Sequence, residues 1–293
     1  MDTGVQDLGP RIEHTLEAVV SKATAGAPPT LAAAMRHAVF PGGARVRPRL
    51  CLAVAGANGL DQLECADAAA ASIELLHCAS LVHDDLPCFD NAETRRGRPS
   101  VHAVFGESVA LLAGDALIVT AFETLGRVAL VAPSRLAPLL GTIARGVGLP
   151  DGIVAGQAWE SEIGATAETC RRAKTGALFV AATRAGAIAS GADPSLWSAL
   201  GERLGEAYQV ADDLLDAAAS QEECGKPVGR DVELARPSAV RDLGISGAVA
   251  KLESLIEAAM QAVPPCRGAS GLRELVRMQA LRLAPKRLVR NAA

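Results

Sequence analysis

Two clusters of aspartates have the residue types and spacing to bind a metal ion. Their members are Asp84, Asp85 and Asp90 in the segment HDDLPCFDNAETRRGRP, and Asp212, Asp213 and Asp216 in the segment YQVADDLLDAA. Carboxylates packed together repel one another unless cations neutralise them. Oxygen-only ligands suit Mg²⁺, which usually bridges carboxylates to substrate phosphates. Either cluster alone could be a solvated helix end, but the pair together favours a site for Mg²⁺ and diphosphate.

The spacing within each cluster predicts its local backbone. Asp212 and Asp216 are spaced i, i+4 and therefore share one helix face. In the first cluster Pro87 disfavours regular helix at Leu86 and lacks a backbone donor. We therefore expect Asp90 to fold back from a kinked or loosened turn.

Basic residues lie near both clusters in the sequence. They are Arg45 and Arg47 in the loop PGGARVRP, Arg95 and Arg96 after the first cluster, and Lys174, Lys226, Arg230 and Arg236 around the second. Arginine forks match phosphate oxygens bidentately, and lysine adds a point charge. Taken alone, Arg45 and Arg230 read better as exposed side chains. His77 lies two turns before Asp84 on nearly the same helix stripe, which favours a hydrogen bond to phosphate over an ordinary core position.

Helical patterns separated by short Gly/Pro segments must position these residues, and no strand pattern of useful length interrupts them. The expected helices are 6–24, 29–39, 47–57, 62–86, 107–131, 134–147, 153–163, 166–190, 195–219, 232–262 with a break near 243–246, and 269–282. The stretches 66–82 and 173–190 are apolar nearly all round, which is typical of helices at the centre of a bundle. The sequence predicts an all-α fold, a large single-domain helical bundle over residues 1–293.

The composition argues against several classes of protein. A net charge of -4 disfavours a nucleic-acid partner, which normally needs a basic surface. The seven cysteines are scattered without a CxxC pair, as expected for reduced thiols in a cytoplasmic protein. The N-terminal segment lacks the apolar core of a signal peptide. Asp115 and Arg184 interrupt the apolar stretches 108–122 and 177–191, so we expect no membrane span.

At these residues the sequence resembles the trans-prenyl diphosphate synthases, the family of farnesyl and geranylgeranyl diphosphate synthases. The likeness runs from about residue 30 to 240, with the motifs in the family's order. PGGARVRP resembles the isopentenyl-site loop, ELLHCASLVHDD the central helix, and DDLPCFDNAETRRGRPSVH the first aspartate-rich motif with its arginines. AKTGALF, YQVADDLLD and GKPVGRD resemble the later motifs.

The resemblance implies an isoprenoid-synthase bundle with a central cavity, a Mg²⁺ cofactor and a homodimer. It implies a prenyltransferase that joins an allylic diphosphate to isopentenyl diphosphate by ionisation, condensation and elimination, without a nucleophilic side chain. The implied Mg²⁺ ligands are Asp84, Asp90 and Asp212, supported by Asp85, Asp213 and Asp216. The residues implied for isopentenyl diphosphate are Arg47, His77 and Arg96, and those for the allylic diphosphate are Arg95, Lys174, Thr175, Gln209, Lys226 and Arg236.

Three residues depart from the family pattern. Ala44 stands where the first loop usually has lysine, which removes one contact to isopentenyl diphosphate and could raise its KM. Arg236 stands where lysine is common, and Glu160 in GQAWE stands where aspartate is common.

Small residues precede the first cluster and bear on product length. Ala79 and Ser80 lie about 6 to 7.5 Å before Asp84 along the helix axis. With the two-residue insertion in DDLPCFD, they resemble bacterial geranylgeranyl diphosphate synthases of carotenoid pathways. They could also be plain packing residues, and a farnesyl diphosphate synthase stays an alternative. A class I terpene cyclase would carry an Asn/Ser/Glu motif in place of the second DDLLD, and the intact aspartates argue against a non-catalytic subunit.

Overall fold

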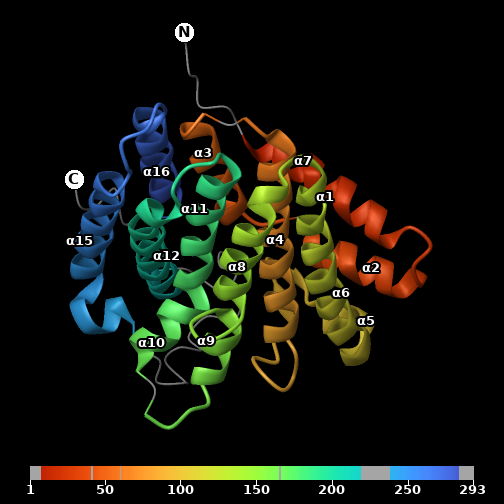
Figure 1. The fold of residues 1–293 in the computed structure, drawn as a ribbon. Coiled ribbons are helices and arrows are strands. Elements are labelled where there is room, and N and C mark those ends of the chain that lie inside the picture. Colours follow the sequence, from red (N-terminus) through yellow and green to blue (C-terminus); the bar gives the residue numbers. More distant parts are fainter. Residues whose placement is uncertain (1–7, 41, 60, 165, 219–237, 284–293) are drawn as a thin grey trace.

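The computed structural model describes residues 8–40, 42–59, 61–164, 166–218 and 238–283, and helices make up most of them (Figure 1). In chain order the elements are α1 (Leu8–Thr24), α2 (Pro29–Val39), α3 (Val46–Ala57), α4 (Leu63–Asp84), β1 (Thr94–Arg95), β2 (Arg98–Pro99), α5 (Val101–Phe105), α6 (Glu107–Gly126), α7 (Val128–Val131), α8 (Pro133–Val147), α9 (Ile153–Trp159), α10 (Ala167–Arg171), η1 (Arg172–Gly176), α11 (Ala177–Ala189), η2 (Pro194–Trp197), α12 (Ser198–Ala218), α15 (Ala239–Gln261) and α16 (Ala269–Leu283). The all-α prediction is confirmed.

The two apolar stretches expected at the centre of the bundle are indeed there. Helix α4 packs against α6, α3 and α11, and α11 packs against α3, α12 and α8, as the middle of Figure 1 shows. Small residues allow these helices to approach closely. A side chain on Gly186 of α11 would lie 2.3 Å from the carbonyl oxygen of Cys51 in α3. An alanine-rich chain with few aromatics therefore builds its core from closely spaced helices.

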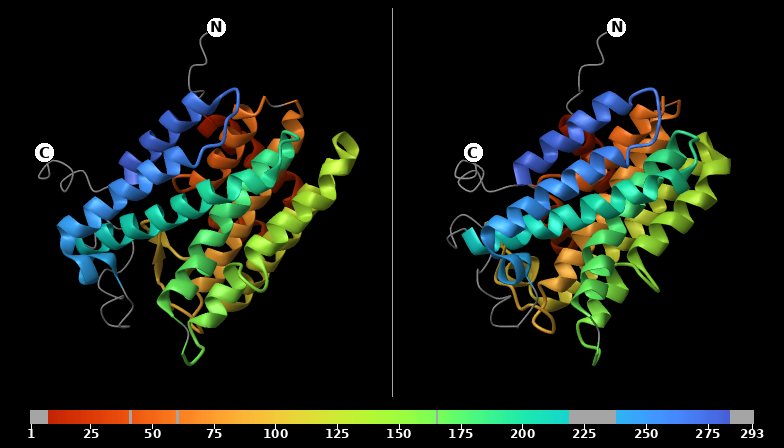
Figure 2. Two further views of the ribbon diagram at one scale, coloured as in Figure 1. Left: turned by 60° about the vertical axis from the view of Figure 1, so that its left-hand side comes forward. Right: turned by 90° about the vertical axis from the view of Figure 1, so that its left-hand side faces the viewer.

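Helices α12, α15 and α16 lie side by side on one flank of this centre (Figure 2). A second apolar cluster, which includes Ala207, Leu214 and Leu252, joins α12 to α15. Gly244 interrupts α15 with a left-handed φ of 69°, so the break predicted near 243–246 is confirmed. In Figure 1 both α4 and α12 run towards the lower end of the view, which brings their aspartate motifs to the same end of the bundle.

The sequence pattern did not predict the short hairpin that follows α4. Strands β1 and β2 pair antiparallel, with Arg95 opposite Arg98. Arg96 and Gly97 form the turn with positive φ values of 54° and 72°, the backbone that two-residue hairpin loops favour. Strands of two residues are too short to show alternation, so the pattern could not reveal them.

Two stretches of the described chain have the length and apolar composition of a membrane-crossing helix, Leu63–Asp84 and Glu107–Val131. The first is α4, and burial in the protein core accounts for its composition. The second spans α6 and α7 and leaves Leu111, Leu112 and Val119 exposed. The expectation that no segment spans a membrane therefore stays a prediction.

Candidate active site

The first aspartate motif begins where α4 ends. The amide of Asp85 still donates to the carbonyl of Leu81, at 3.0 Å, and regular helix stops before Pro87. The chain then turns back, and the amide of Asp90 donates to the carbonyl of Asp84 at 2.9 Å. The predicted fold-back is confirmed, because it brings the backbone of Asp90 beside that of Asp84.

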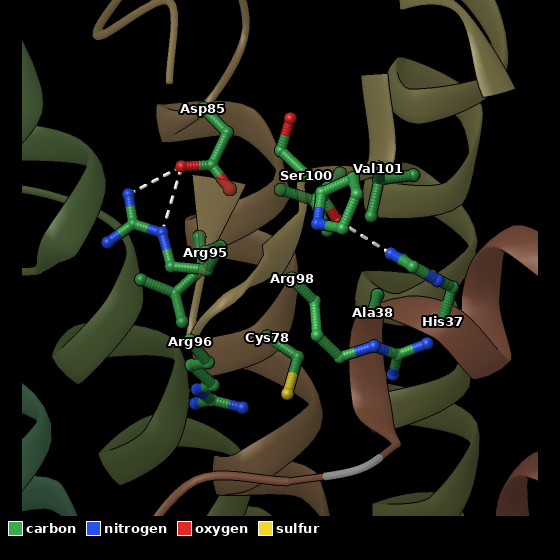
Figure 3. Close-up of a pocket in the computed structure, with 12 residues that line it drawn as sticks. His37, Ala38, Cys78, Asp85, Arg95, Arg96, Arg98, Ser100 and Val101 are labelled. Carbon is green, nitrogen blue, oxygen red and sulfur yellow. Dashed lines mark hydrogen bonds and ion pairs between the residues drawn. The ribbon is translucent and has the colours of Figure 1, made fainter. Parts of the chain in front are cut away.

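The two adjacent aspartates of this motif differ in their surroundings. The side chain of Asp84 is 13% exposed, whereas that of Asp85 is 3% exposed. Arg95 Nε donates to Asp85 Oδ1 at 2.9 Å (Figure 3). Burial raises the pKa of Asp85, although hydrogen bonds from Arg95 oppose the rise. Asp85 therefore anchors the hairpin arginine, and Asp84 is the member of the pair that is nearer to solvent.

Lys174 links the first aspartate motif to Glu160, which follows α9. Its Nζ lies 3.1 Å from Asp84 Oδ1 and 3.1 Å from Glu160 Oε1. Lys174 lies in η1, a π-helical segment, and such segments often occur at functional sites. A side chain on Gly156 would lie 2.3 Å from the backbone nitrogen of Lys174. Close approach of α9 thus brings Glu160 to the ammonium group.

The second motif shows the same division between its adjacent aspartates. Asp213 is buried and accepts hydrogen bonds from Gln209 Nε2 at 3.1 Å and from the amide of Ala239 at 2.7 Å. Burial raises the pKa of Asp213, and these two hydrogen bonds oppose the rise. Thr175 Oγ1 donates to Gln209 Oε1 at 3.3 Å. Asp213 thus holds the start of α15, and Asp212 is only partly buried.

Arg47 lies between α4 and α12. Its Nη1 donates to His77 Nε2 at 3.4 Å, and its guanidinium lies 4.5 Å from the ring centre of Phe179 and 5.4 Å from that of Tyr208. Burial lowers the pKa of Arg47, and the negatively charged Asp212 is among the groups that oppose this decrease. A desolvated guanidinium attracts phosphate more strongly than a hydrated one.

His77 is neutral in this setting. Burial lowers the pKa of His77 well below its usual value, and the positive charges of Arg47 and Arg96 lower it further. Since Arg47 can only donate, His77 Nε2 accepts and Nδ1 carries the proton. The three residues predicted for isopentenyl diphosphate thus lie within electrostatic reach of one another.

The hairpin arginines also line a recess between α2, α4 and β1–β2 (Figure 3). Arg95, Arg96 and Arg98 lie on one side of it, and His37 and Cys78 lie on the helices. Figure 3 shows Arg95 directed at Asp85, whereas Arg96 points away from that pair. The hairpin therefore supplies cations in two directions.

The residues present fit Mg²⁺ by their donor chemistry. Across the described ranges, no three acidic, histidine or cysteine side chains lie close enough together to hold an ion by themselves. Mg²⁺ is usually bound through one or two carboxylates, with water and substrate phosphate as its other ligands. Asp84 and Asp212 offer such carboxylates from two helices, so the site suits a metal that arrives with diphosphate.

Some of the residues predicted from the sequence lie outside the described ranges, and one prediction is wrong. Lys226, Arg230 and Arg236 lie outside the described residues. Reading Arg45 alone as an exposed side chain is wrong, because it is buried between Glu13 and Glu74. The sequence reading also missed the residues that surround Arg45 and Arg47, namely Glu13, Glu74, Phe179 and Tyr208. Glu74 had a signal, since it is the one acid between Ala68 and Val82 in an apolar helical stretch.

The chain is similar in sequence and in fold to several known proteins. A family model described as polyprenyl synthetase matches residues 28–264. Geranylgeranyl diphosphate synthase of Cereibacter sphaeroides is 50% identical over 94% of this chain and 96% of its own length. The crystal structure of geranylgeranyl pyrophosphate synthetase from Pyrococcus horikoshii is 30% identical with a TM-score of 0.76, covering 94% of this chain and 98% of that one. Geranyltransferase from Helicobacter pylori, crystallised with magnesium and isoprenyl diphosphate, is 28% identical with a TM-score of 0.78, covering 96% of this chain and 100% of that one.

Proposed function

The chain belongs to the polyprenyl synthetase family, and from this premise we propose that it makes geranylgeranyl diphosphate by Mg²⁺-dependent condensation of an allylic diphosphate with isopentenyl diphosphate. It is a prenyltransferase, and the relatives named geranylgeranyl diphosphate synthase support the product. The magnesium in the Helicobacter pylori structure supports the cofactor.

The observation that carries this proposal is the presence of two groups of cations near the two aspartate motifs. Arg47 contacts His77 and lies within electrostatic reach of Asp212, whereas Lys174 contacts Asp84. Two such groups can neutralise two diphosphates. A class I terpene cyclase binds a single diphosphate and would have no use for the group around Arg47. A non-catalytic subunit would need neither group.

On the allylic side, we infer that Lys174 and Arg95 bind the diphosphate beside Asp84. When bound by Asp84, Asp90 and Asp212, Mg²⁺ would act as a Lewis acid on the departing diphosphate. The ammonium of Lys174 and the guanidinium of Arg95 add positive charge where negative charge develops. Their pairing with carboxylates keeps both groups in place before substrate arrives.

Further residues complete the proposed allylic site. Thr175 and Gln209 hold each other by a hydrogen bond at the junction of η1 and α12, where they could contact a phosphate oxygen. Lys226 and Arg236, which lie outside the described residues, are proposed from the family motifs. On the isopentenyl side, Arg47 and Arg96 supply charge, and the neutral His77 can donate one hydrogen bond.

The proposed product length rests on the turn of α4 that precedes Asp84. Ala79 is buried, and the hydroxyl of Ser80 donates to the carbonyl of His77 at 2.8 Å. Neither side chain is an aromatic ring that would block the tail at this depth. Their small size supports a twenty-carbon product in preference to a fifteen-carbon one. A central cavity for the tail is part of the proposal.

We also propose one domain over residues 1–293, a homodimer, a cytoplasmic location and a role in supplying carotenoid synthesis. The exposed Leu111, Leu112 and Val119 of α6 support a dimer contact, because packing such apolar side chains against a second copy of the chain would remove them from water. The cysteines of the described segments are free thiols, which suits a reducing compartment.

The test is a product analysis. Purified protein is incubated with Mg²⁺, isopentenyl diphosphate and dimethylallyl, geranyl or farnesyl diphosphate, and the products are sized. Twenty-carbon diphosphate as the main product would support the proposal. Fifteen-carbon diphosphate would favour a farnesyl diphosphate synthase. A cyclic hydrocarbon would favour a terpene cyclase, and no turnover of any starter would refute the proposal.

A further inference from the structure

Arg45 is held at the start of α3 by groups from three other helices. Its Nε and Nη2 donate to Glu13 of α1 at 2.7 and 3.2 Å, and its Nη1 donates to Glu74 of α4 at 2.7 Å. Its Nη2 also donates to the carbonyl of Val39 in α2 at 2.8 Å. Only 3% of the Arg45 side chain is exposed. Four of the five N–H groups of a guanidinium are thereby engaged, so Arg45 is not free to bind phosphate.

The backbone at Arg45 is also unusual. Its φ of 50° and ψ of 38° lie in the left-handed region, which a non-glycine residue adopts when its surroundings hold it there. The carbonyl of Arg45 accepts the amide of Arg49 at 3.1 Å, so this residue begins α3. Arg47 follows in the first turn of that helix. The geometry of Arg45 therefore sets the position of Arg47 at the start of the helix.

The turn before α3 lies directly on two arginine side chains. A side chain on Gly42 would lie 2.1 Å from Cζ of Arg45, and one on Gly43 would lie 2.9 Å from Nε of Arg96. Neighbouring glycines thus pack against Arg45 and against Arg96. A shift of the Arg45 guanidinium would move the turn and with it the contact to Arg96.

Glu74 balances the charge of this group. Its side chain is 2% exposed, and it lies one helical turn before His77 on α4. Burial lowers the pKa of Arg45, but the hydrogen bond to Glu13 and the charge of Glu74 raise it more, so the net shift is upward. The charge of Glu74 also raises the pKa of the neighbouring Arg47. One buried carboxylate therefore stabilises two buried guanidiniums.

We propose that Arg45 is a positioning residue for isopentenyl diphosphate binding, an inference that rests on the proposed function. Clamped by Glu13 and Glu74, its guanidinium holds the 42–47 turn so that Arg47 and Arg96 present their forks to one diphosphate. Lysine could not replace it, because a single ammonium lacks the planar fork that reaches Glu13, Glu74 and Val39 together.

The test separates positioning from plain stability. Arg45→Met and Glu74→Gln remove the clamp, and Arg11→Met is the matched control. Arg11 Nε pairs with Asp67 Oδ1 at 2.7 Å and joins the same helices, α1 and α4, away from the turn. The KM for each substrate, kcat and Tm are measured for all variants and for the unmodified enzyme.

We expect Arg45→Met to raise the KM for isopentenyl diphosphate at least about tenfold, since misplacing a binding group by about 1 Å can cost on the order of a hundredfold. The KM for the allylic diphosphate should stay within about twofold of its value in the unmodified enzyme. That change corresponds to much less binding free energy than the about 1.4 kcal/mol of a tenfold effect. Glu74→Gln should act in the same direction, Arg45→Lys should not restore the low KM, and Arg11→Met should alter Tm alone.

An unchanged KM for isopentenyl diphosphate in a folded Arg45→Met enzyme would overturn the proposal, as would an equal rise for both substrates. If Arg45→Met does not fold, Glu13→Gln replaces it, because the Glu13 side chain is 43% exposed and tolerates change. An unaltered KM for isopentenyl diphosphate in Glu13→Gln would then count against the clamp. Failure of the proposed function is distinct, because the unmodified enzyme itself would then form no prenyl product in this assay.

Discussion

Replacing Ala79 with phenylalanine should shorten the product, and the structure indicates by how much. Ala79 precedes Asp84 by five residues, or about 7.5 Å along the axis of α4 at 1.5 Å per residue. Ala79 is 1% exposed, and on the proposed path of the tail a ring at this position would share space with the growing chain. Inserting volume into a packed interior costs about 1–3 kcal/mol. If only the longer intermediate meets the ring, that cost slows the last condensation by about 5- to 150-fold, at 1.36 kcal/mol per factor of ten.

The assay is the ratio of twenty-carbon to fifteen-carbon diphosphate, with dimethylallyl diphosphate as starter and isopentenyl diphosphate in excess. The first condensations should proceed, because the aspartate motif lies more than a helical turn away. Ala248→Phe is the matched control, since Ala248 is equally buried but lies on α15, in the cluster that packs on α12. A folded, active Ala79→Phe enzyme with an unaltered ratio would show that the tail does not pass this face of α4, and the product assignment would lose its physical basis.

Three further predictions test the site itself. Asp84→Ala and Asp212→Ala should each lower turnover at saturating Mg²⁺ by about a thousandfold, because a metal contributes several kcal/mol of charge stabilisation; near-normal turnover would remove these residues from the metal site. Ala44→Lys should lower the KM for isopentenyl diphosphate more than it changes kcat, because Ala44 is exposed and a new ammonium there would bind ground and transition states alike; a constant or higher KM in steady-state kinetics would mean that position 44 does not face the diphosphate or that another cation already fills that role. Because the pKa of His77 is lowered in the folded state, unfolded His77 takes up a proton first as pH falls below about 6.5, and stability should drop by up to about 1.4 kcal/mol per pH unit. His77→Gln should flatten the urea-unfolding free energy between about pH 6.5 and 5, and an unaltered slope would contradict a neutral His77.

The helices were predictable because their signals are local. The expected helix 29–39 coincides with α2, which begins at Pro29, a residue favoured in the first turn. The expected helix 62–86 differs from α4 by a few terminal residues, since Pro87 limits its end. Apolar residues all round α4 also predicted its central place. Such properties need no knowledge of the partner helices.

The burial of Arg45 was not predictable in this way. Its partners Glu13 and Glu74 lie 32 and 29 residues away in the chain, so only the packing of α1 and α4 brings them to it. The π-helical segment at Lys174 is a second case. The sequence predicts one helix over 166–190, but the close backbone contacts at Gly156 and Gly205 accompany a wider turn there. In both places tertiary contacts override the local pattern.

The two DD pairs show how one local rule organises this site. Adjacent residues on a helix do not face the same way, so both aspartates of a pair cannot point into one site. At the C-terminal end of α4 the second member, Asp85, is buried and holds Arg95. In α12 the second member, Asp213, is buried and holds Gln209 and the start of α15 at Ala239. The second aspartate of each pair thus fixes a group that the proposed allylic site uses. The first, Asp84 or Asp212, stays nearer to solvent, where a metal ion that arrives with diphosphate can reach it.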